Sequence, residues 1–347
     1  MGSATNGLHF RAAPRGQDTS LALKRPAGHA LLDPFAFRAG STSMPLPRCR
    51  IVPLPAEQVS VEIDNTERVR WHFGSNAPRP FFYPFNGPSG HSLTRMGHPG
   101  APDHDHHRSI WFAHAKVLGI DFWSNNTEAR IGQQQWLAYR DGDEEAVLAM
   151  QLGWYDGHEP HPLIQQELVA AVRPGPDGES FLELQSTFTP TAETLELGQT
   201  NFGFLAVRVA ANISEHFGGG TLTDSEGRIH EKAIFGNASR WVDYSGPVPG
   251  DKTEGITYFD HPGNASYPSR WHVREDGWMG AGICRTQSRV LKRGAPLALR
   301  YLLHAHGGQY DHDRATSVAG AFAKRPRLVV SKSTVKHQHH VVAREAS

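Results

Sequence analysis

The chain has 347 residues, and its 35 Lys and Arg side chains balance its 35 Asp and Glu side chains, so the formal net charge is zero. The chain has no excess of positive charge that would favour binding to nucleic acid or an anionic membrane. The balance fits neutral partners such as sugars better. No stretch approaches the roughly 18 apolar residues of a membrane span, and no apolar run of secretory length follows Met1. Two cysteines, Cys49 and Cys284, cannot build a disulfide framework, so we expect a cytoplasmic protein.

Three segments of the chain differ in composition. Residues 1–48 are rich in Gly, Ala, Arg, Pro and Ser and lack sustained periodicity, which predicts an N-terminal extension that is poorly ordered or draped over the domain. No clear linker interrupts the pattern that follows, so residues 49–335 are predicted to form a single β-sandwich domain. Residues 336–347 are predicted to form a C-terminal tail.

The predicted domain consists of short β-strands joined by turns. Residues 59–63 and 69–73 alternate apolar and polar side chains, and the polar turn at 64–66 predicts a hairpin between them. Further strand patterns recur at 79–83, 109–113, 146–152, 165–172, 181–188, 202–211, 255–259, 297–303 and 328–330. The best amphipathic helix is at 314–324. Many strands and few helices predict an all-β fold, a large antiparallel β-sandwich.

Residues 103–108 read Asp-His-Asp-His-His-Arg, and we call this segment the histidine knot. In an extended segment His104 and His106 share one face, and His107 points to the other. Two imidazoles at i and i+2 can bind one divalent metal ion, Zn, Mn, Fe or Ni, with a third ligand from elsewhere. General acid/base catalysis or direct substrate binding is an alternative, as is a solvated loop whose histidines cap strands and hold Arg108.

A second polar cluster follows the predicted strand at 255–259. Asp260 and His261 end this strand, and Asn264 lies in the turn after it. An amide side chain both donates and accepts hydrogen bonds, which suits a hydroxyl-rich ligand. The sequence therefore predicts that this turn contributes to a sugar-binding site.

A third group of candidates lies further along the chain. Trp271 offers a flat apolar face to a sugar ring, or is an ordinary core tryptophan. His272 and Arg274 alternate with Trp271 and so share one face of a strand. His304 and His306 form another i, i+2 pair at a strand end, and either could join the histidine knot. No nucleophile elbow, phosphate-binding loop, zinc-protease helix motif or dinucleotide fingerprint is present.

Several segments together resemble the bacterial family labelled methane oxygenase PmoA. They are residues 79–84, 87–95, 103–108, 111–114, 119–123, 241–246, 259–262 and 271–274. The resemblance runs from about Arg79 to His306. It implies that the gene lies near genes for sugar oxidoreductases and sugar isomerases in carbohydrate-degrading bacteria. The strand-rich pattern with a His-Arg site is also similar to the galactose-mutarotase-like supersandwich.

These features favour a carbohydrate-active enzyme that acts on a sugar or an oxidised (keto) glycoside by histidine-mediated proton transfer, as an epimerase or a lyase. The residues expected to carry catalysis are His104, His107, Arg108 and His272. In this hypothesis His107 or His104 is the base, and Arg108 fixes a hydroxyl or steadies oxyanion charge. The residues expected to bind substrate are Arg79, Tyr83, Arg95, Trp111, His114, Asp260, His261, Asn264, Trp271 and Arg274. A divalent metal that polarises the carbonyl is expected on His104, His106 and His306.

Two alternatives remain open from the sequence. One is a non-catalytic sugar-binding or sensing protein that uses the same pocket. The other is a metal-dependent oxygenase, as the family label implies. We expect a small-molecule carbohydrate as the partner, with no nucleic acid and no membrane, and the sequence leaves homo-oligomer formation open.

Overall fold

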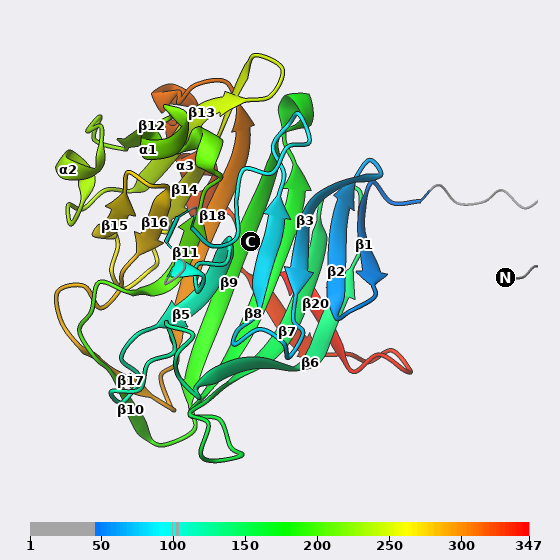
Figure 1. The fold of residues 1–347 in the computed structure, drawn as a ribbon. Coiled ribbons are helices and arrows are strands. Elements are labelled where there is room, and N and C mark those ends of the chain that lie inside the picture. The colour runs from blue at the N-terminus through cyan, green and yellow to red at the C-terminus, as the bar shows by residue number, and fades with distance from the viewer. Residues whose placement is uncertain (1–45, 99, 102–103, 347) are drawn as a thin grey trace, which may run out of the picture. The chain divides into compact units, whose positions relative to one another are not determined.

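The computed structural model describes residues 46–98, 100–101 and 104–346, which belong to one compact unit, Leu46–Ser347 (Figure 1). The predicted extension at 1–48 lies almost entirely outside these residues, as does Asp103 of the histidine knot. The predicted fold class is confirmed, because two large antiparallel sheets of eight strands each pack face to face as a β-sandwich. No helix of the described part is long and apolar enough to cross a membrane.

The strands of the two large sheets come from all parts of the described chain. The first sheet contains, in spatial order, β1 (Cys49–Leu54), β2 (Gln58–Ile63), β3 (Thr66–His72), β4 (Phe81–Phe85), β5 (Ile110–His114), β11 (Gly203–Arg208), β16 (Trp278–Ala281) and β15 (Trp271–Arg274). The second sheet contains β12 (Thr221–Asp224), β13 (Trp241–Val248), β14 (Lys252–Asp260), β18 (Leu297–Gly307), β9 (Ser180–Pro190), β8 (Ile164–Pro174), β7 (Ala146–Tyr155) and β6 (Arg130–Arg140).

Smaller elements complete the unit. They are the strand pair β10 (Thr194–Leu197) and β17 (Arg289–Lys292), the pair β19 (Leu328–Lys332) and β20 (His340–Arg344), and the helices α1 (Glu215–Gly218), α2 (Glu231–Ile234) and α3 (His312–Lys324). The predicted hairpin forms as β2 and β3, where Asp64 and Asn65 take the left-handed backbone conformation (φ 52° and 61°) that a tight two-residue turn needs.

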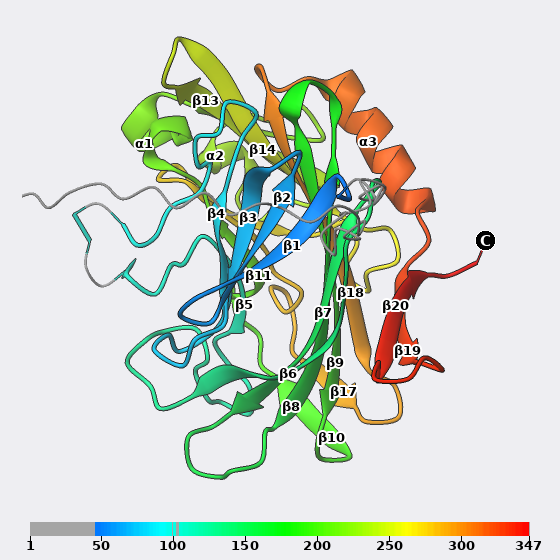
Figure 2. The same cartoon turned by 90° about the vertical axis from the view of Figure 1, so that its right-hand side faces the viewer.

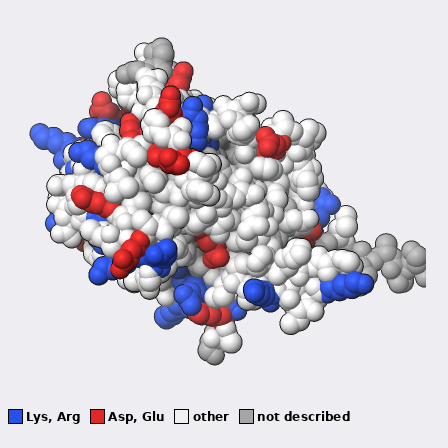
Figure 3. Space-filling model, turned by 90° about the horizontal axis from the view of Figure 1, so that it is seen from below, with Lys and Arg blue, Asp and Glu red and all other residues white. Residues whose placement is uncertain are grey.

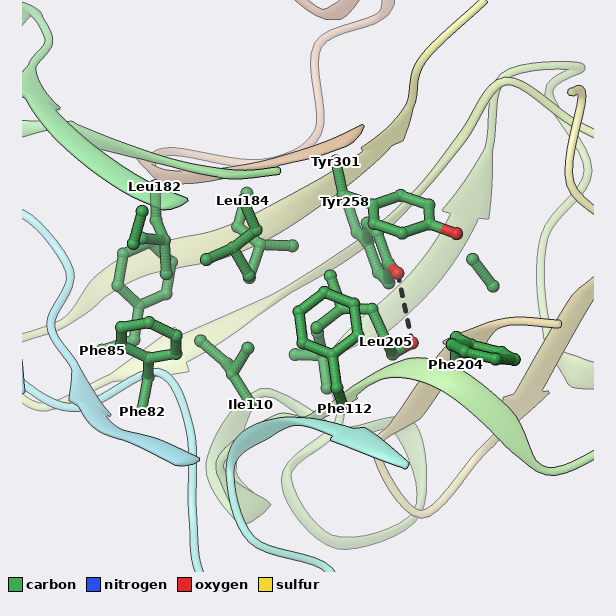
Figure 4. Packing of buried hydrophobic residues seen from close by; sticks show 14 of the residues in the cluster. Phe82, Phe85, Ile110, Phe112, Leu182, Leu184, Phe204, Leu205, Tyr258 and Tyr301 are labelled. Carbon is green, nitrogen blue, oxygen red and sulfur yellow. Dashed lines mark hydrogen bonds between the residues drawn. The ribbon is translucent and has the colours of Figure 1, made fainter. Parts of the chain in front are cut away.

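The core lies between the two sheets (Figure 4). Ile110 and Phe112 of the first sheet point toward Leu184 of the second, and all three side chains are buried. The Tyr258 hydroxyl of the second sheet donates a hydrogen bond of 3.1 Å to the backbone carbonyl of Leu205 in the first. Apolar burial of this kind is the main stabilising contribution to a sandwich, and this hydrogen bond satisfies the one polar group that Tyr258 brings into the core.

The outer face of the second sheet is covered by α3 and by the pair β19–β20 (Figure 2). Helix α3, which includes the helix predicted at 314–324, is capped by the Asp311 side chain and buries Phe322 against this face. The predicted tail at 336–347 contains β20, whose Arg344 bonds Glu145 at 2.7 Å and Glu183 at 2.8 Å. The sequence analysis missed this strand although its partner β19 precedes it by a short loop, whereas the ion-pair partners of Arg344 are distant in the chain.

The outer face of the first sheet carries an aromatic layer. Side chains alternate along each strand, so Phe82, Ile110 and Leu205 face the core. Their neighbours face outward and pack with one another in a separate cluster of Phe81, Trp111, Ala113, Trp123, Ala206 and Trp278. On the face of the molecule shown in Figure 3, acidic and basic side chains are interspersed.

Candidate functional site

A cavity of about 620 Å³ lies over the aromatic layer on the outer face of the first sheet. Strands β11, β15 and β16 contribute side chains to it, and the loops before β5 and after β15 form its walls. It is lined by His98, His104, His106, His107, Trp123, Phe202, Arg208, His216, Phe217, Glu231, His272, Arg274, Glu275, Asp276 and Trp278. Six histidines and five charged side chains over aromatic rings are the composition of a binding or catalytic site.

Tryptophan rings form the floor of this cavity. Trp123 and Trp278 line it, with their ring centroids 5.1 Å apart and their planes at 75°. Trp111 is 1% exposed and does not line the cavity. The centroid of its ring lies 5.5 Å from that of Trp123 and 5.3 Å from that of Trp278. Trp111 was expected to bind substrate, and the structure instead makes it the support beneath the two rings that do line the cavity.

The histidine knot reaches the cavity because its loop closes on itself. The backbone amide of Gly97 donates to the carbonyl of His107 at 2.7 Å, and the Arg79 guanidinium donates to the carbonyl of His106 at 3.3 Å. Within the knot, the amide of His107 donates to the carbonyl of His104 at 3.0 Å, which makes the segment a turn. The predicted alternation of an extended segment is therefore wrong, and His104, His106 and His107 all line the cavity.

The three imidazoles of the knot pack against one another and against the floor. The ring centroids of His106 and His107 are 4.3 Å apart, and those of His104 and His107 are 5.2 Å apart. His107 lies 4.8 Å from Trp278 and is 7% exposed. Burial, with Arg208 nearby, holds the pKa of His107 far below its usual value, so this imidazole is neutral and a weak proton acceptor.

An ion pair at the end of β11 organises one wall of the cavity. Arg208 donates from Nη1 to Oδ1 of Asp276 at 2.7 Å and from Nη2 to Oδ2 at 2.9 Å. Burial opposes ionisation of Asp276, but Arg208 outweighs it and keeps the pKa of this carboxyl below its usual value. Nε2 of His98 lies 3.1 Å from Oδ2 of the same carboxylate. Because a carboxylate only accepts, Nε2 of His98 carries the proton and Nδ1 is its basic atom.

Strand β15 contributes the opposite wall. His272 and Arg274 point into the cavity on one face of the strand, as their alternation predicted. Nδ1 of His272 donates to the Asn201 carbonyl at 3.0 Å, so Nε2 is the basic atom. Burial lowers the pKa of His272 to about 4, which keeps it neutral at pH 7. Arg274 donates to Oε1 of Glu231 at 2.6 Å and lies over the ring of Phe235.

Trp271 does not line the cavity. It points to the face of β15 opposite to His272, is fully buried in the core, and donates from its indole to the Ser239 carbonyl at 2.8 Å. The prediction that it forms a sugar platform is wrong, and the core alternative is confirmed. The same alternation that brings His272 to the cavity takes its neighbour away from it.

The turn at 260–264 does not line the cavity either. Asn264 donates to Oδ1 of Asp260 at 2.6 Å and accepts from the amide of Arg300 at 2.8 Å, so it fastens the turn to β18. Burial raises the pKa of Asp260 to about 6 and, with Arg300, lowers that of His261 to about 4. These three residues hold the turn together, and the structure does not bring them into the cavity to which the other predicted residues belong.

The remaining predicted residues surround the cavity without lining it. Arg108 lies over the ring of Phe81, so the oxyanion role expected of it has no support from its position. His114 is 1% exposed and donates to the Gly198 carbonyl at 3.0 Å, and burial lowers its pKa to about 4. Tyr83 packs against the aromatic layer, whereas Arg79 donates to the Ser124 carbonyl at 2.7 Å and Arg95 to the Asp276 carbonyl at 2.7 Å.

The metal site predicted on His104, His106 and His306 is not assembled. His306 lies in the second sheet, is 1% exposed, and pairs with Asp243 at 2.8 Å. His104 and His106 are close, with ring centroids 5.8 Å apart. Within residues 46–98, 100–101 and 104–346, no group of three or more His, Cys, Asp or Glu side chains is arranged to hold a metal ion.

Sequence reasoning missed several residues of the cavity, above all Arg208, Asp276 and His98. Arg208 lies within the apolar segment at 202–211 and ends β11, and a single arginine in a buried strand is a signal that could have been used. Asp276 lies in a polar turn between β15 and β16 and carries no local signal. Its role depends on β11 lying beside β16, which is a contact between distant parts of the chain.

The fold and the site define an antiparallel β-sandwich protein with a histidine- and tryptophan-lined pocket on the outer face of one sheet. The chain belongs to a family of unknown function, DUF6807, whose sequence pattern matches residues 58–320. This match includes the whole segment that carries the resemblance seen in the sequence, but the label methane oxygenase PmoA is not the one it gives. Curated proteins include no match to the chain.

Solved structures with some likeness to the chain include sugar-related enzymes. A proposed mutarotase from Salmonella typhimurium is 14% identical over 76% of this chain and 95% of its own, with a TM-score of 0.31. An aldose epimerase homologue from C. elegans is 7% identical over 76% and 99%, with a TM-score of 0.33. The 4-alpha-glucanotransferase from Thermococcus litoralis is 11% identical over 75% and 39%, with a TM-score of 0.30. TM-scores this low establish neither a shared activity nor a shared site.

Proposed function

We propose that the protein is a carbohydrate-active enzyme that moves a proton on a neutral sugar or keto glycoside, as an epimerase or a lyase. The observation that carries this proposal is the pair of oriented imidazoles, His98 and His272, that line a pocket with a tryptophan floor. Each has its proton fixed on one ring nitrogen by a hydrogen bond to an oxygen atom. Each therefore keeps its other nitrogen unprotonated, Nε2 in His272 and Nδ1 in His98, and Nδ1 of His98 is buried in this structure.

The lining of the pocket favours a sugar as the ligand. The faces of Trp123 and Trp278 can pack against the C–H groups of a pyranose ring, and the polar rim can bond its hydroxyl groups. Among the described lining residues, two cations, Arg208 and Arg274, stand against three carboxylates, so the formal charge is 2 − 3 = −1 with neutral histidines. A neutral sugar fits this balance better than an anionic one.

We assign His98 as the base, and because its Nδ1 is buried without a hydrogen-bond partner among the described residues, proton transfer to this atom requires the surrounding loop to shift when substrate binds. Asp276 holds its Nε2–H, as a carboxylate orients the imidazole of a catalytic dyad, and so stabilises the imidazolium that forms when Nδ1 takes a proton. His107, expected to be the base, is less suited, because burial leaves it too weak a proton acceptor. We assign His107 to holding the floor and the knot in place.

The proposed reaction needs a carbon–hydrogen bond beside a carbonyl group. His98 takes the proton, and the electron pair of that bond moves onto the carbonyl oxygen to give an enolate. Arg274 lies in the pocket and can steady this oxyanion. Return of a proton from solvent to the other face of the carbon gives the epimer. Elimination follows instead when the enolate electron pair forms a carbon–carbon double bond and a substituent on the next carbon leaves with its bonding electrons.

Exchange of substrate hydrogen with solvent tests this proposal. We expect NMR in D₂O to show deuterium entering a keto glycoside beside its carbonyl, and the rate to fall by about 100-fold or more in the His98→Gln variant. His91→Gln, at an exposed histidine outside the pocket, is the matched control and should exchange like the wild type. Sugar binding without any exchange would instead show the non-catalytic sugar-binding alternative.

A further inference from the structure

A second cavity, of about 800 Å³, adjoins the sugar pocket. Phe202 lines both cavities and lies between them, with its ring centroid 5.6 Å from Trp123 and 5.2 Å from His272. Asn201 lines the second cavity, and its carbonyl accepts the hydrogen bond from His272 of the first. A ligand longer than one sugar ring can therefore pass across Phe202 from one cavity into the other.

One wall of the second cavity, the loop at 198–202, is held in place by hydrogen bonds. The loop at 198–202 is fastened on one side by the amide of Gly198, which donates to the Lys116 carbonyl at 2.7 Å. On the other side the amide of Thr200 donates to the Cys284 carbonyl at 3.0 Å. The amide of Gln199 also donates to the Ser288 hydroxyl at 3.0 Å. A wall held in this way presents a preformed surface to a ligand, which lowers the entropic cost of binding.

The charge of the second cavity is opposite to that of the first. Its described lining contains two cations, Lys116 and Arg285, and one carboxylate, Glu196, so its formal charge is 2 − 1 = +1. Neither Lys116 nor Arg285 forms an ion pair with any residue that the structure describes. Cations without a partner beside a polar cavity favour an anionic ligand group.

Of the two cations, Arg285 is the stronger indication of an anion-binding site. Its guanidinium lies 4.3 Å from the centre of the Phe235 ring, and that of Arg274 lies 4.6 Å from the same ring. Glu231 neutralises Arg274, whereas Nη1 of Arg285 is buried without a hydrogen-bond acceptor among the described residues. Burial and the nearby charges of Arg274 and Arg270 lower the pKa of Arg285, so an anion placed beside it would relieve an unfavourable charge arrangement.

We infer that the second cavity is an anion-binding subsite. The substrate is then a glycoside in which a neutral sugar occupies the first cavity and a group bearing a carboxylate or a phosphate occupies the second, against Arg285 and Lys116. This inference rests on the proposed function for the first cavity. The anion contacts themselves depend only on the second.

Binding of matched ligand pairs tests the inference. Isothermal titration would compare a neutral disaccharide, cellobiose, with its uronic acid counterpart, and glucose with glucose 1-phosphate. We expect the acidic member of at least one pair to bind about tenfold more tightly than the neutral member, because it gains a charge-assisted contact with Arg285 or Lys116. A tenfold ratio of dissociation constants corresponds to a difference in binding free energy of about 1.4 kcal/mol. The pair that shows the preference distinguishes a carboxylate from a phosphate. Equal affinity within both pairs would overturn the inference.

The variant Arg285→Gln/Lys116→Gln should bring the ratio of affinities within the preferred pair close to one. The matched control is Arg293→Gln/Lys292→Gln, which removes two cations from residues outside the lining and should leave that ratio unchanged. D-glucuronate and inorganic phosphate, each tested alone by thermal shift, separate the two proposals. Stabilisation by one of them that needs Arg285, with no binding of any sugar, would support the anion subsite and refute the proposed function.

Discussion

Arg208 and Asp276 form a bidentate ion pair across the wall of the pocket, with donor–acceptor distances of 2.7 Å and 2.9 Å. The Arg208 side chain has no exposed surface, whereas that of Asp276 is 25% exposed. A guanidinium so deeply buried needs its partner, because removing one member of a buried pair leaves an uncompensated charge. The pair therefore serves both the stability of β11 and the orientation of His98.

Asp276→Asn should lower the free energy of unfolding by about 3 kcal/mol, because Arg208 then stays buried without a counter-charge. Chemical denaturation followed by circular dichroism measures this change. Glu275→Gln, at a neighbouring carboxylate that is 62% exposed, is the control and should change stability by less than about 0.5 kcal/mol. Similar effects of the two substitutions would show that the ion pair contributes little.

The free energy of unfolding should fall as the pH is lowered, because the buried imidazole of His114 is harder to protonate in the folded protein than in the unfolded chain. Its pKa is about 4 in the folded protein against a usual value of 6.5, so the unfolded chain binds more protons between these two values. The free energy of unfolding contributed by His114 is then fully present above about pH 6.5 and is lost as the pH falls to 4, by about 3 kcal/mol.

Urea titrations at several pH values, with the wild type and His114→Gln, measure this contribution. Glutamine can still donate to the Gly198 carbonyl but does not titrate, so the loss of stability between pH 7 and pH 4 should be smaller in the variant. An identical pH dependence of the two proteins would contradict the prediction. His272 has a pKa of about 4 as well and should retain its own share of the effect in His114→Gln.

Trp123→Ala should weaken sugar binding about tenfold, because it removes one of the two ring faces of the pocket floor. The control is Trp136→Ala, at a tryptophan of β6 that packs against Phe73 outside the pocket. Affinities are to be compared by titration at a temperature at which both variants are folded. Equal losses in the two variants would mean that the tryptophan floor does not contact the ligand.

The last strand, β20, should be fastened mainly by Arg344. This side chain is 17% exposed and bonds Glu145 and Glu183, which are 7% and 2% exposed. Arg344→Met leaves buried carboxylates with fewer counter-charges and should cost about 3 kcal/mol of stability. Arg327→Met breaks the pair with Glu345, in which both partners are about half exposed, and should cost less than about 1 kcal/mol. Thermal unfolding of the two variants gives the comparison.

The fold could be predicted from the sequence because alternation along a strand is a local signal. The hairpin of β2 and β3 and the helix α3 follow from patterns within a dozen residues. The alternation along β15 also predicted correctly that His272 and Arg274 lie on the same face of the strand. What alternation could not give was which face was the core face, so Trp271 was assigned to the pocket although it lies in the core.

The pocket could be predicted only in part because it depends on strand order. The histidine knot drew attention to the right loop, but its turn follows from hydrogen bonds such as that of Gly97 to His107, not from spacing. Arg208 reaches Asp276, which in turn bonds His98, because β11 lies between β5 and β16. His306 ends β18 in the other sheet, so a shared pattern of i, i+2 histidines did not mean a shared site.

The placement of the pocket on the outer face of the first sheet has a consequence for how this family can diversify. On β15, Trp271 and Val273 hold the sandwich together, while His272 and Arg274 face the ligand. Substitutions at His272 and Arg274 leave Trp271 and Val273 in place. Ligand specificity can therefore change while the fold is kept. Directed evolution limited to the outward positions of β11, β15 and β16 should therefore yield folded proteins with altered ligand preference at a high rate.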